Sequence, residues 1–236
     1  MLKTITVTIV KEPRISAKML CEYAESSAIA RKSILKACKI KDPRIISISK
    51  RYNQAEDLIS ECLEYSFEYL GILKEYAKDL RQKSKTLTGK QNEYTLQCAE
   101  ALEQFYRMRN QIRTSFGKFI INNAVNIKGR KLDINNVRIS IRPELMLSNE
   151  GGNTEVGFIK LCFCKSKPLT DSLANGIAAL GRFYFSSVKN LDFRSENCVV
   201  IDVFANKVFF APKSDKRILS LLAACCMEIA DRWDKI

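Results

Sequence analysis

The sequence contains no histidine, and its 236 residues include only one tryptophan, five prolines and nine glycines. The lack of histidine excludes Ser-His-Asp and Cys-His catalysis and histidine-ligated metals, because these chemistries need a side chain that titrates near neutral pH. Any catalysis must therefore use carboxylates, lysine, tyrosine, cysteine or a metal held by carboxylates. With 46% hydrophobic and 28% charged residues, the composition is that of a globular protein and argues against disorder.

The sequence also lacks a long hydrophobic run. Its most apolar stretch, Ile218 to Ala230, is flanked by charged residues and is shorter than the roughly 18 apolar residues that cross a bilayer. Residues 1–10 alternate between polar and apolar like a strand, and they lack the features of a secretory signal peptide. We therefore expect a cytoplasmic protein with no membrane partner.

The nine cysteines lie mostly within segments of periodic hydrophobicity. This placement predicts buried free thiols in a reducing compartment. The two closest pairs, Cys162/Cys164 and Cys225/Cys226, do not have the CxxC spacing of a zinc site, and no histidine can complete one. The cysteine pattern therefore disfavours zinc.

The net charge of +13 is concentrated in one half of the chain. Residues 1–130 contain 24 basic and 14 acidic residues, whereas residues 131–236 contain 15 and 12. Residues 31–51 and 107–131 are especially poor in acids. Such stretches suit phosphate backbones, although a solvated surface that keeps the protein soluble has the same composition. The side chains that we expect to contact nucleic acid are Arg31, Lys32, Lys36, Lys39, Arg107, Arg109 and Arg113.

Residues 1–50 read as an N-terminal strand followed by a basic helical element. Two short helices are expected, one at residues 17–24 capped by Ser16 and a second, capped by Ser26 or Ser27, that runs to about Lys39. This arrangement favours a helix-turn-helix in which the second helix exposes its basic side chains and buries Ile29, Ile34 and Leu35, although any helical hairpin in a basic protein has a similar pattern.

Residues 51–118 are expected to form a long helical hairpin. Hydrophobic residues recur with helical spacing from about residue 54 to 84, with a kink at Gly71, and again from about 92 to 115. The hairpin could also serve as the interface of a homodimer or as a surface for a protein partner.

Residues 119–236 are expected to form a mixed-sheet core with flanking helices at 169–187 and 214–233, which together with residues 51–118 makes one compact domain. The expected strands, placed in one sheet, are Phe119–Ile127, Val137–Ile141, Val156–Cys164, Val199–Phe204 and Lys207–Ala211. Helices and strands in this order predict an α+β fold with an α/β-like core.

Three charged residues in the C-terminal half of the chain lie within or directly after predicted strands. Lys160 lies in the middle of a strand that is apolar on both faces, Asp202 is embedded in another apolar strand, and Glu144 follows a strand. An ammonium removed from water costs several kcal/mol unless it is paired. We therefore expect Lys160 to meet one or both carboxylates, either as a buried ion pair or as a catalytic group.

The order of these elements resembles the PD-(D/E)xK nuclease-like fold, also called restriction-endonuclease-like, over roughly residues 50–236. The sequence Arg142-Pro143-Glu144-Leu145 resembles the first element of its motif, and Phe158-Ile159-Lys160 stands in the place of the second. The resemblance implies that two carboxylates hold Mg²⁺ beside the phosphate while the lysine orients the nucleophile. Residues 157–161 with Asp202 and Trp233 are also similar to uncharacterised bacterial proteins, which implies no activity.

Phe158 occupies the position of the second carboxylate, and this departure separates three hypotheses. The preferred one is a nucleic-acid-binding protein with a degenerate, non-cleaving nuclease-like core and no cofactor, as would fit a mobile-element or antiphage protein. The second is an active Mg²⁺-dependent nuclease that uses Glu144, Lys160 and a carboxylate from elsewhere. The third is a non-enzymatic regulatory or interaction module. The carboxylates that could replace the missing ligand are Glu155, Asp202, Glu61, Glu64 and Glu68, with Glu144 and Glu155 as the expected metal ligands and Asp202 as a further catalytic residue.

Overall fold

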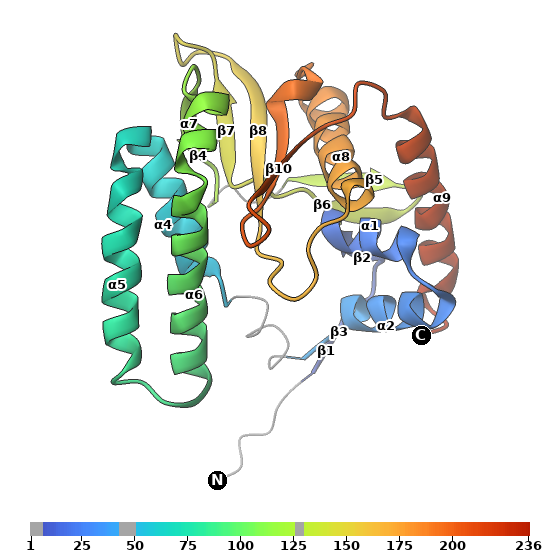
Figure 1. The fold of residues 1–236 in the computed structure, drawn as a ribbon. Helices are drawn as coiled ribbons and strands as arrows, with labels where there is room; N and C mark the ends of the chain where they lie inside the picture. Colours follow the sequence, from blue (N-terminus) through green and yellow to red (C-terminus); the bar gives the residue numbers. More distant parts are fainter. Residues whose placement is uncertain (1–6, 43–50, 126–129) are drawn as a thin grey trace.

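A five-stranded mixed sheet lies at the centre of the protein, with helices on both of its faces (Figure 1). The computed structural model describes residues 7–42, 51–125 and 130–236. The strands, in spatial order, are β10 (Lys207–Phe210), β9 (Cys198–Asp202), β8 (Glu155–Cys162), β7 (Leu145–Ser148) and β4 (Ile120–Asn123). β8 and β9 are parallel, and the other neighbours are antiparallel. The α+β class predicted from the sequence is therefore confirmed.

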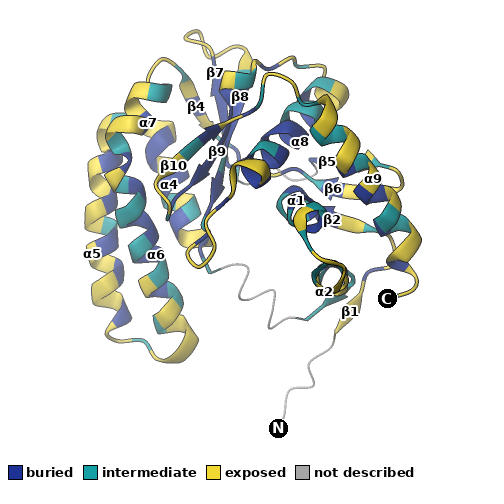
Figure 2. Cartoon of the chain, turned by 45° about the vertical axis from the view of Figure 1, so that its right-hand side comes forward, coloured by how far each residue is buried: buried dark blue, intermediate teal, exposed yellow. Residues whose placement is uncertain are grey.

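The two faces of the sheet belong to two separate hydrophobic cores. Along β8, Ile159 and Leu161 belong to one core, whereas Phe158 and Cys162 belong to the other. The first core is covered by α4 (Asn53–Tyr65), α5 (Ile72–Ser84), α6 (Gly89–Arg107) and α7 (Arg109–Phe116), and the second by α1 (Ala17–Glu25), α2 (Ala28–Lys39), α8 (Asp171–Lys189) and α9 (Lys216–Trp233). Because both faces are covered, the central strands are almost wholly buried (Figure 2).

A second, three-stranded sheet contains the strand that the sequence assigned to the central sheet. It consists of β2 (Arg14–Ser16), β6 (Val137–Ser140) and β5 (Lys131–Ile134) in that order, with β2 and β6 parallel. The expectation that Val137–Ile141 joins the central sheet is therefore wrong, and β7 takes that place. Pro143, which has no N–H to donate to a ladder, lies in the segment where the chain passes from one sheet to the other.

The N-terminal region joins the three-stranded sheet and packs against the helices of the second core. β2 pairs with β6, and α1 packs against α8 and α9. β1 (Thr8–Ile9), before β2, and β3 (Ile40–Lys41), after α2, pair with each other in a small two-stranded sheet. The side chains of Ser16 and Ser27 cap α1 and α2, as the sequence predicted.

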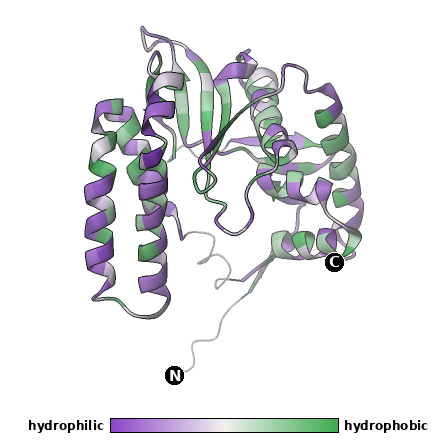
Figure 3. Ribbon diagram, viewed as in Figure 1, coloured by the Kyte–Doolittle hydropathy of each residue, from purple (hydrophilic) through white to green (hydrophobic). Residues whose placement is uncertain are grey.

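The long helix expected over residues 54–84 is interrupted at Ser66. There the backbone is extended, and the Ser66 side chain accepts a hydrogen bond from the backbone N–H of Glu68, so α4 ends and a short 3₁₀ helix (Phe67–Gly71) leads into α5. The antiparallel hairpin is formed by α5 and α6, which present polar outer surfaces (Figure 3). α4 instead lies against β4, and this places its first turn near the centre of the molecule.

None of the helices in the described ranges combines the length and hydropathy required to cross a membrane. All nine cysteines are free and buried, as their sequence context predicted.

Candidate functional site

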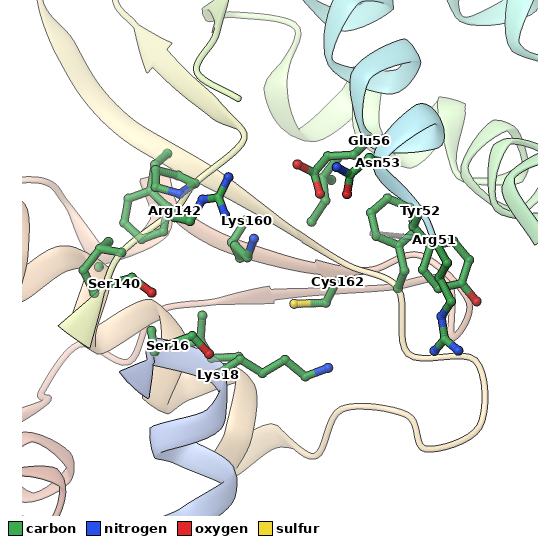
Figure 4. Close-up of a pocket in the computed structure, with 18 residues that line it drawn as sticks. Ser16, Lys18, Arg51, Tyr52, Asn53, Glu56, Ser140, Arg142, Lys160 and Cys162 are labelled. Carbon is green, nitrogen blue, oxygen red and sulfur yellow. The ribbon is translucent and has the colours of Figure 1, made fainter. Parts of the chain in front are cut away.

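A pocket of about 500 Å³ opens where β8 passes between α1, α4 and α8 (Figure 4). Its polar lining comes from segments that are far apart in the sequence. These residues include Ser16 and Lys18 of α1 and its cap, Arg51, Asn53 and Glu56 at the start of α4, Ser140 at the end of β6 and Arg142 after it, and Lys160 and Cys162 of β8.

Glu144 and Lys160 form an ion pair at the base of this pocket. Leu145 pairs with Ile159 across β7 and β8, so the next step of the antiparallel ladder brings Glu144 opposite Lys160. Lys160 Nζ donates a hydrogen bond to Glu144 Oε1, and the backbone N–H of Leu161 donates to Glu144 Oε2 at 2.5 Å. The expected meeting of this lysine with a carboxylate is therefore confirmed for Glu144.

The two partners differ in their access to the pocket. The side chain of Glu144 is 3% exposed and that of Lys160 is 24% exposed. Burial is the largest single influence and favours the neutral amine of Lys160. The charge of Glu144, the hydrogen bond to it and the nearby Cys162 and Glu56 together outweigh burial and raise the pKa of Lys160 above its usual value. Burial raises the pKa of Glu144, while Lys160 and the Leu161 amide oppose that rise. The pair thus presents a protonated lysine to the pocket.

Glu56 supplies a second carboxylate that the sequence reasoning did not select. It lies in the first turn of α4, lines the pocket and has a pKa raised to about 7, first by burial and second by the charge of Glu144. Helical spacing could have placed this half-buried residue on the inner side of α4, because Ser60 and Leu63, one and two turns further on, are buried. Glu61, Glu64 and Glu68, which the sequence offered as replacements for the missing metal ligand, are exposed. Glu64 accepts a hydrogen bond from the Asn123 N–H at the sheet edge.

Phe158, at the position of the missing acid, is a core residue. Its side chain is 2% exposed and its ring is stacked on that of Phe185, with centroids 5.6 Å apart. Gly181 of α8 lies against the same ring, so closely that a Cβ there would be 2.4 Å from Phe158 Cζ. This position therefore packs α8 against β8, and within the described residues no group of three or more His, Cys, Asp or Glu side chains is placed to hold a metal ion.

Asp202 and Glu155 lie apart from the Glu144–Lys160 pair. Asp202 is fully buried and accepts hydrogen bonds from the backbone N–H groups of Leu169 at 2.8 Å and Ala205 at 3.2 Å, so its carboxylate holds two loops. Glu155 begins β8, at the opposite end of the strand from Lys160, and lines a different pocket. The expected meeting of Lys160 with Asp202, and the pairing of Glu144 with Glu155 as metal ligands, are not seen.

The pocket is surrounded by positive charge. Lys18, Arg51 and Arg142 line it in addition to Lys160 (Figure 4). The first turns of α1 and α4 also face it, and the N-terminus of a helix carries a partial positive charge and free N–H groups. The arrangement is suited to an anion such as a phosphate group.

The basic side chains expected to contact nucleic acid fall into two groups. Three are engaged within the protein: Arg31 pairs with Glu228 at 2.8 Å, Lys39 donates to the Trp233 carbonyl at 2.6 Å, and Arg109 stacks on Tyr106. The other residues, Lys32, Lys36, Arg107 and Arg113, are exposed.

The helix-turn-helix expectation required a different orientation of α2. Ile29, expected in the core, is 83% exposed, whereas Arg31, expected in solvent, faces α9. Leu35 is buried as expected, Ile34 is half-buried, and Cys38 completes the buried face of α2, so the expectation fails at Ile29 and Arg31.

No protein-family model matches this chain, and no curated protein matches it significantly.

Proposed function

We propose that this protein binds nucleic acid, with a phosphate group seated in the pocket above the Glu144–Lys160 pair, and that it does not cleave the strand. The observation that carries the proposal is the set of four basic side chains that line this pocket together with two helix N-termini. Each phosphate that such a site neutralises releases counterions, which favours binding at low salt.

The resemblance to PD-(D/E)xK nucleases supports the same proposal. Glu144 directly precedes β7, and Lys160 lies on the neighbouring strand β8, which agrees with the order of acid and lysine in that motif. The central sheet is mixed and covered by helices on both faces. We infer a degenerate restriction-endonuclease-like core, in which Phe158 fills the position of the second carboxylate and packs against Gly181.

Fluorescence anisotropy tests the binding. Labelled single-stranded and double-stranded oligonucleotides are titrated with the full chain at about 50 mM and 200 mM salt, concentrations between which phosphate contacts lose much of their strength. We expect binding at the lower concentration that weakens steeply at the higher one. If neither form binds at low salt, the proposal is wrong.

A second function, Mg²⁺-dependent cleavage, is favoured by Glu56. It provides a second carboxylate near Glu144, close enough for the charge of Glu144 to raise the pKa of Glu56, and a divalent ion binds oxygen ligands of this kind. In this alternative Glu56 is the carboxylate from elsewhere that replaces the acid missing at Phe158. Incubation of labelled DNA and RNA with the protein and Mg²⁺ or Mn²⁺ tests it. Cleavage lost in both Glu56→Gln and Glu144→Gln would establish this alternative, whereas intact substrate, or cleavage that persists in both variants, would eliminate it.

A further inference from the structure

A second basic pocket adjoins the first. It has a volume of about 650 Å³ and lies between the N-terminal strands and the three-stranded sheet. Ser16 and Ser140, which are partners in the parallel pairing of β2 with β6, line both pockets. The two pockets therefore adjoin at this serine pair, and we call them together the basic groove.

Positive charge dominates the basic groove. Its described lining contains nine basic side chains and two acidic ones. The basic ones are Lys11, Arg14, Lys18, Lys41, Arg51, Lys131, Arg138, Arg142 and Lys160, and the acidic ones are Glu12 and Glu56. Each of the two acids is offset locally: Glu12 is paired with Arg138 at 3.3 Å, and Glu56 faces Lys160 and Arg142.

Two exposed cations are free to bind a ligand at the outer end of the basic groove. Arg14 on β2 and Lys131 on β5 flank β6, and neither has an ion-pair partner among residues 7–42, 51–125 and 130–236. Arg138, between them, already contacts Glu12 and Asp133. The charges of Arg14 and Lys131, like that of the exposed Lys11 in the same lining, are therefore available to a phosphate backbone.

An aromatic pair lies at the inner end of the basic groove. Phe163, half-buried after β8, and Tyr52 are stacked with centroids 5.1 Å apart and planes within 16°, and both line the first pocket. Single-stranded nucleic acids are bound by grooves of this composition, in which cations follow the backbone and aromatic rings stack on bases. The paired bases of a duplex are not available for such stacking.

We propose that the basic groove binds a single-stranded segment of nucleic acid, with its backbone passing from Arg14 and Lys131 over the Ser16–Ser140 pair to Lys160 and a base against Phe163. This inference rests on the proposed function and adds to it the form of the ligand and its path. The exposed lysines of α2 take no part in this path, because they line neither pocket.

Charge-removal variants of the full chain test the path. The double variant Arg14→Ala/Lys131→Ala removes two cations from the basic groove, and Lys32→Ala/Lys36→Ala removes two exposed cations from α2 as a matched control. Anisotropy is measured with a 20-nucleotide single strand, in DNA and RNA form, and with the corresponding DNA duplex. We expect the groove variant to bind the single strand about tenfold more weakly, with a salt slope smaller by about 1.4, as for two lost phosphate contacts. The control variant should bind like the unmodified protein.

A conservative variant tests the stacking. Phe163→Leu keeps a hydrophobic side chain of similar size at this half-buried position but removes the ring. We expect affinity for the single strand to fall by roughly fivefold or more, as for the loss of a stacked base, with the salt slope unchanged. Unchanged affinity would remove Phe163 from the path.

The outcomes separate the two proposals. If the unmodified protein binds no nucleic acid, the proposed function fails and the path fails with it. If it binds but the groove variant retains full affinity, or if the α2 control is the one that loses it, the path is wrong while the function stands. Duplex binding as tight as single-strand binding, with equal sensitivity to the groove variant, would overturn the single-stranded form of the ligand.

Discussion

Glu144 and Lys160 pair across two neighbouring strands, yet only Lys160 reaches the pocket. The carboxylate is 3% exposed and is held by the lysine and by the Leu161 amide, whereas the lysine is 24% exposed. In this geometry the acid fixes the lysine in place and keeps it protonated. The ammonium group of the lysine can then also interact with an anion in the pocket. The pair is therefore better arranged to bind a phosphate group than to activate water.

The unequal exposure of the two partners predicts unequal costs of removing them. Lys160→Met leaves a buried carboxylate without its counter-ion, which we expect to cost about 3 kcal/mol at pH 8. Glu144→Gln leaves a lysine that can still reach water, and we expect it to cost about 1 kcal/mol. Urea unfolding followed by circular dichroism measures both values.

The loss in Lys160→Met should also shrink as the pH falls, because protonation of Glu144 then removes the unpaired charge. In Glu144→Gln this pH dependence should be absent. Equal costs for the two variants at pH 8 would contradict the asymmetry on which the phosphate site depends.

Glu56 predicts a pH dependence of stability. Its pKa in the folded protein is about 7, above the ordinary value of 4.5. Between pH 4.5 and 7 the folded state therefore keeps a proton that the unfolded state has lost, so stability falls as the pH rises through this window and is level above it. At about 1.4 kcal/mol for each pKa unit, the fall due to this group should be at most about 3 kcal/mol.

Glu56→Gln is the matched variant, because it keeps the shape and removes the titration. Its stability should lose the fall between pH 4.5 and 7, which makes it more stable than the unmodified protein at pH 8. Its affinity for a single-stranded oligonucleotide should also vary less with pH. In the unmodified protein Glu56 becomes charged as the pH rises and then repels phosphate, whereas glutamine stays neutral. Identical pH profiles of the two proteins would show that Glu56 does not titrate in this range.

The close packing of Phe158 against Gly181 predicts a sharp difference between two glycines. Gly181→Ala places a Cβ 2.4 Å from the Phe158 ring, and the buried ring must move. We expect this to cost about 1 to 3 kcal/mol, as overpacked cores do. Gly71→Ala, where the backbone is helical and nothing lies within 4 Å, should be neutral or stabilise by a few tenths of a kcal/mol. Thermal unfolding of both variants measures the difference, and similar midpoints would contradict the assignment of Phe158 to packing.

Arg31 and Lys32 are adjacent in sequence and should behave differently. Arg31 donates to Glu228 and to the carbonyl groups of Tyr23 and Ala24, so Arg31→Ala should destabilise the protein by about 1 to 3 kcal/mol without changing the salt slope of binding. Lys32 is exposed, and Lys32→Ala should change neither property. A loss of affinity in Arg31→Ala at unchanged stability would restore this residue to the nucleic-acid interface.

The sequence predicted the features that depend on local pattern. The capping serines of α1 and α2, the buried cysteines and the partner for Lys160 all followed from periodicity or from the cost of burying a charge. Strand assignment failed where tertiary pairing decides: Val137–Ser140 has an ordinary strand pattern, and its membership of the second sheet depends on β2, more than 120 residues earlier in the chain. Such a pairing leaves no local signal.

The binding residues were predicted less well for a related reason. Counting charges along the chain identified α2 as basic. It could not show that Arg31 and Lys39 hold α2 to α9, Arg31 through Glu228 and Lys39 through the Trp233 carbonyl at the end of α9. The residues that surround the pocket come from separate stretches of the chain, and Glu56 reaches it only because α4 begins there. Periodicity gave the buried face of α4 but not what that face would meet.

The most direct test of the account compares a single-stranded oligonucleotide with an uncharged peptide nucleic acid of the same base sequence, both labelled and titrated with the full chain at low salt. The two ligands offer the same bases, but only the first has phosphates. The phosphate site predicts binding to the oligonucleotide and none, or far weaker binding, to the peptide nucleic acid. Equal affinity for both ligands, or no binding to either, would contradict it.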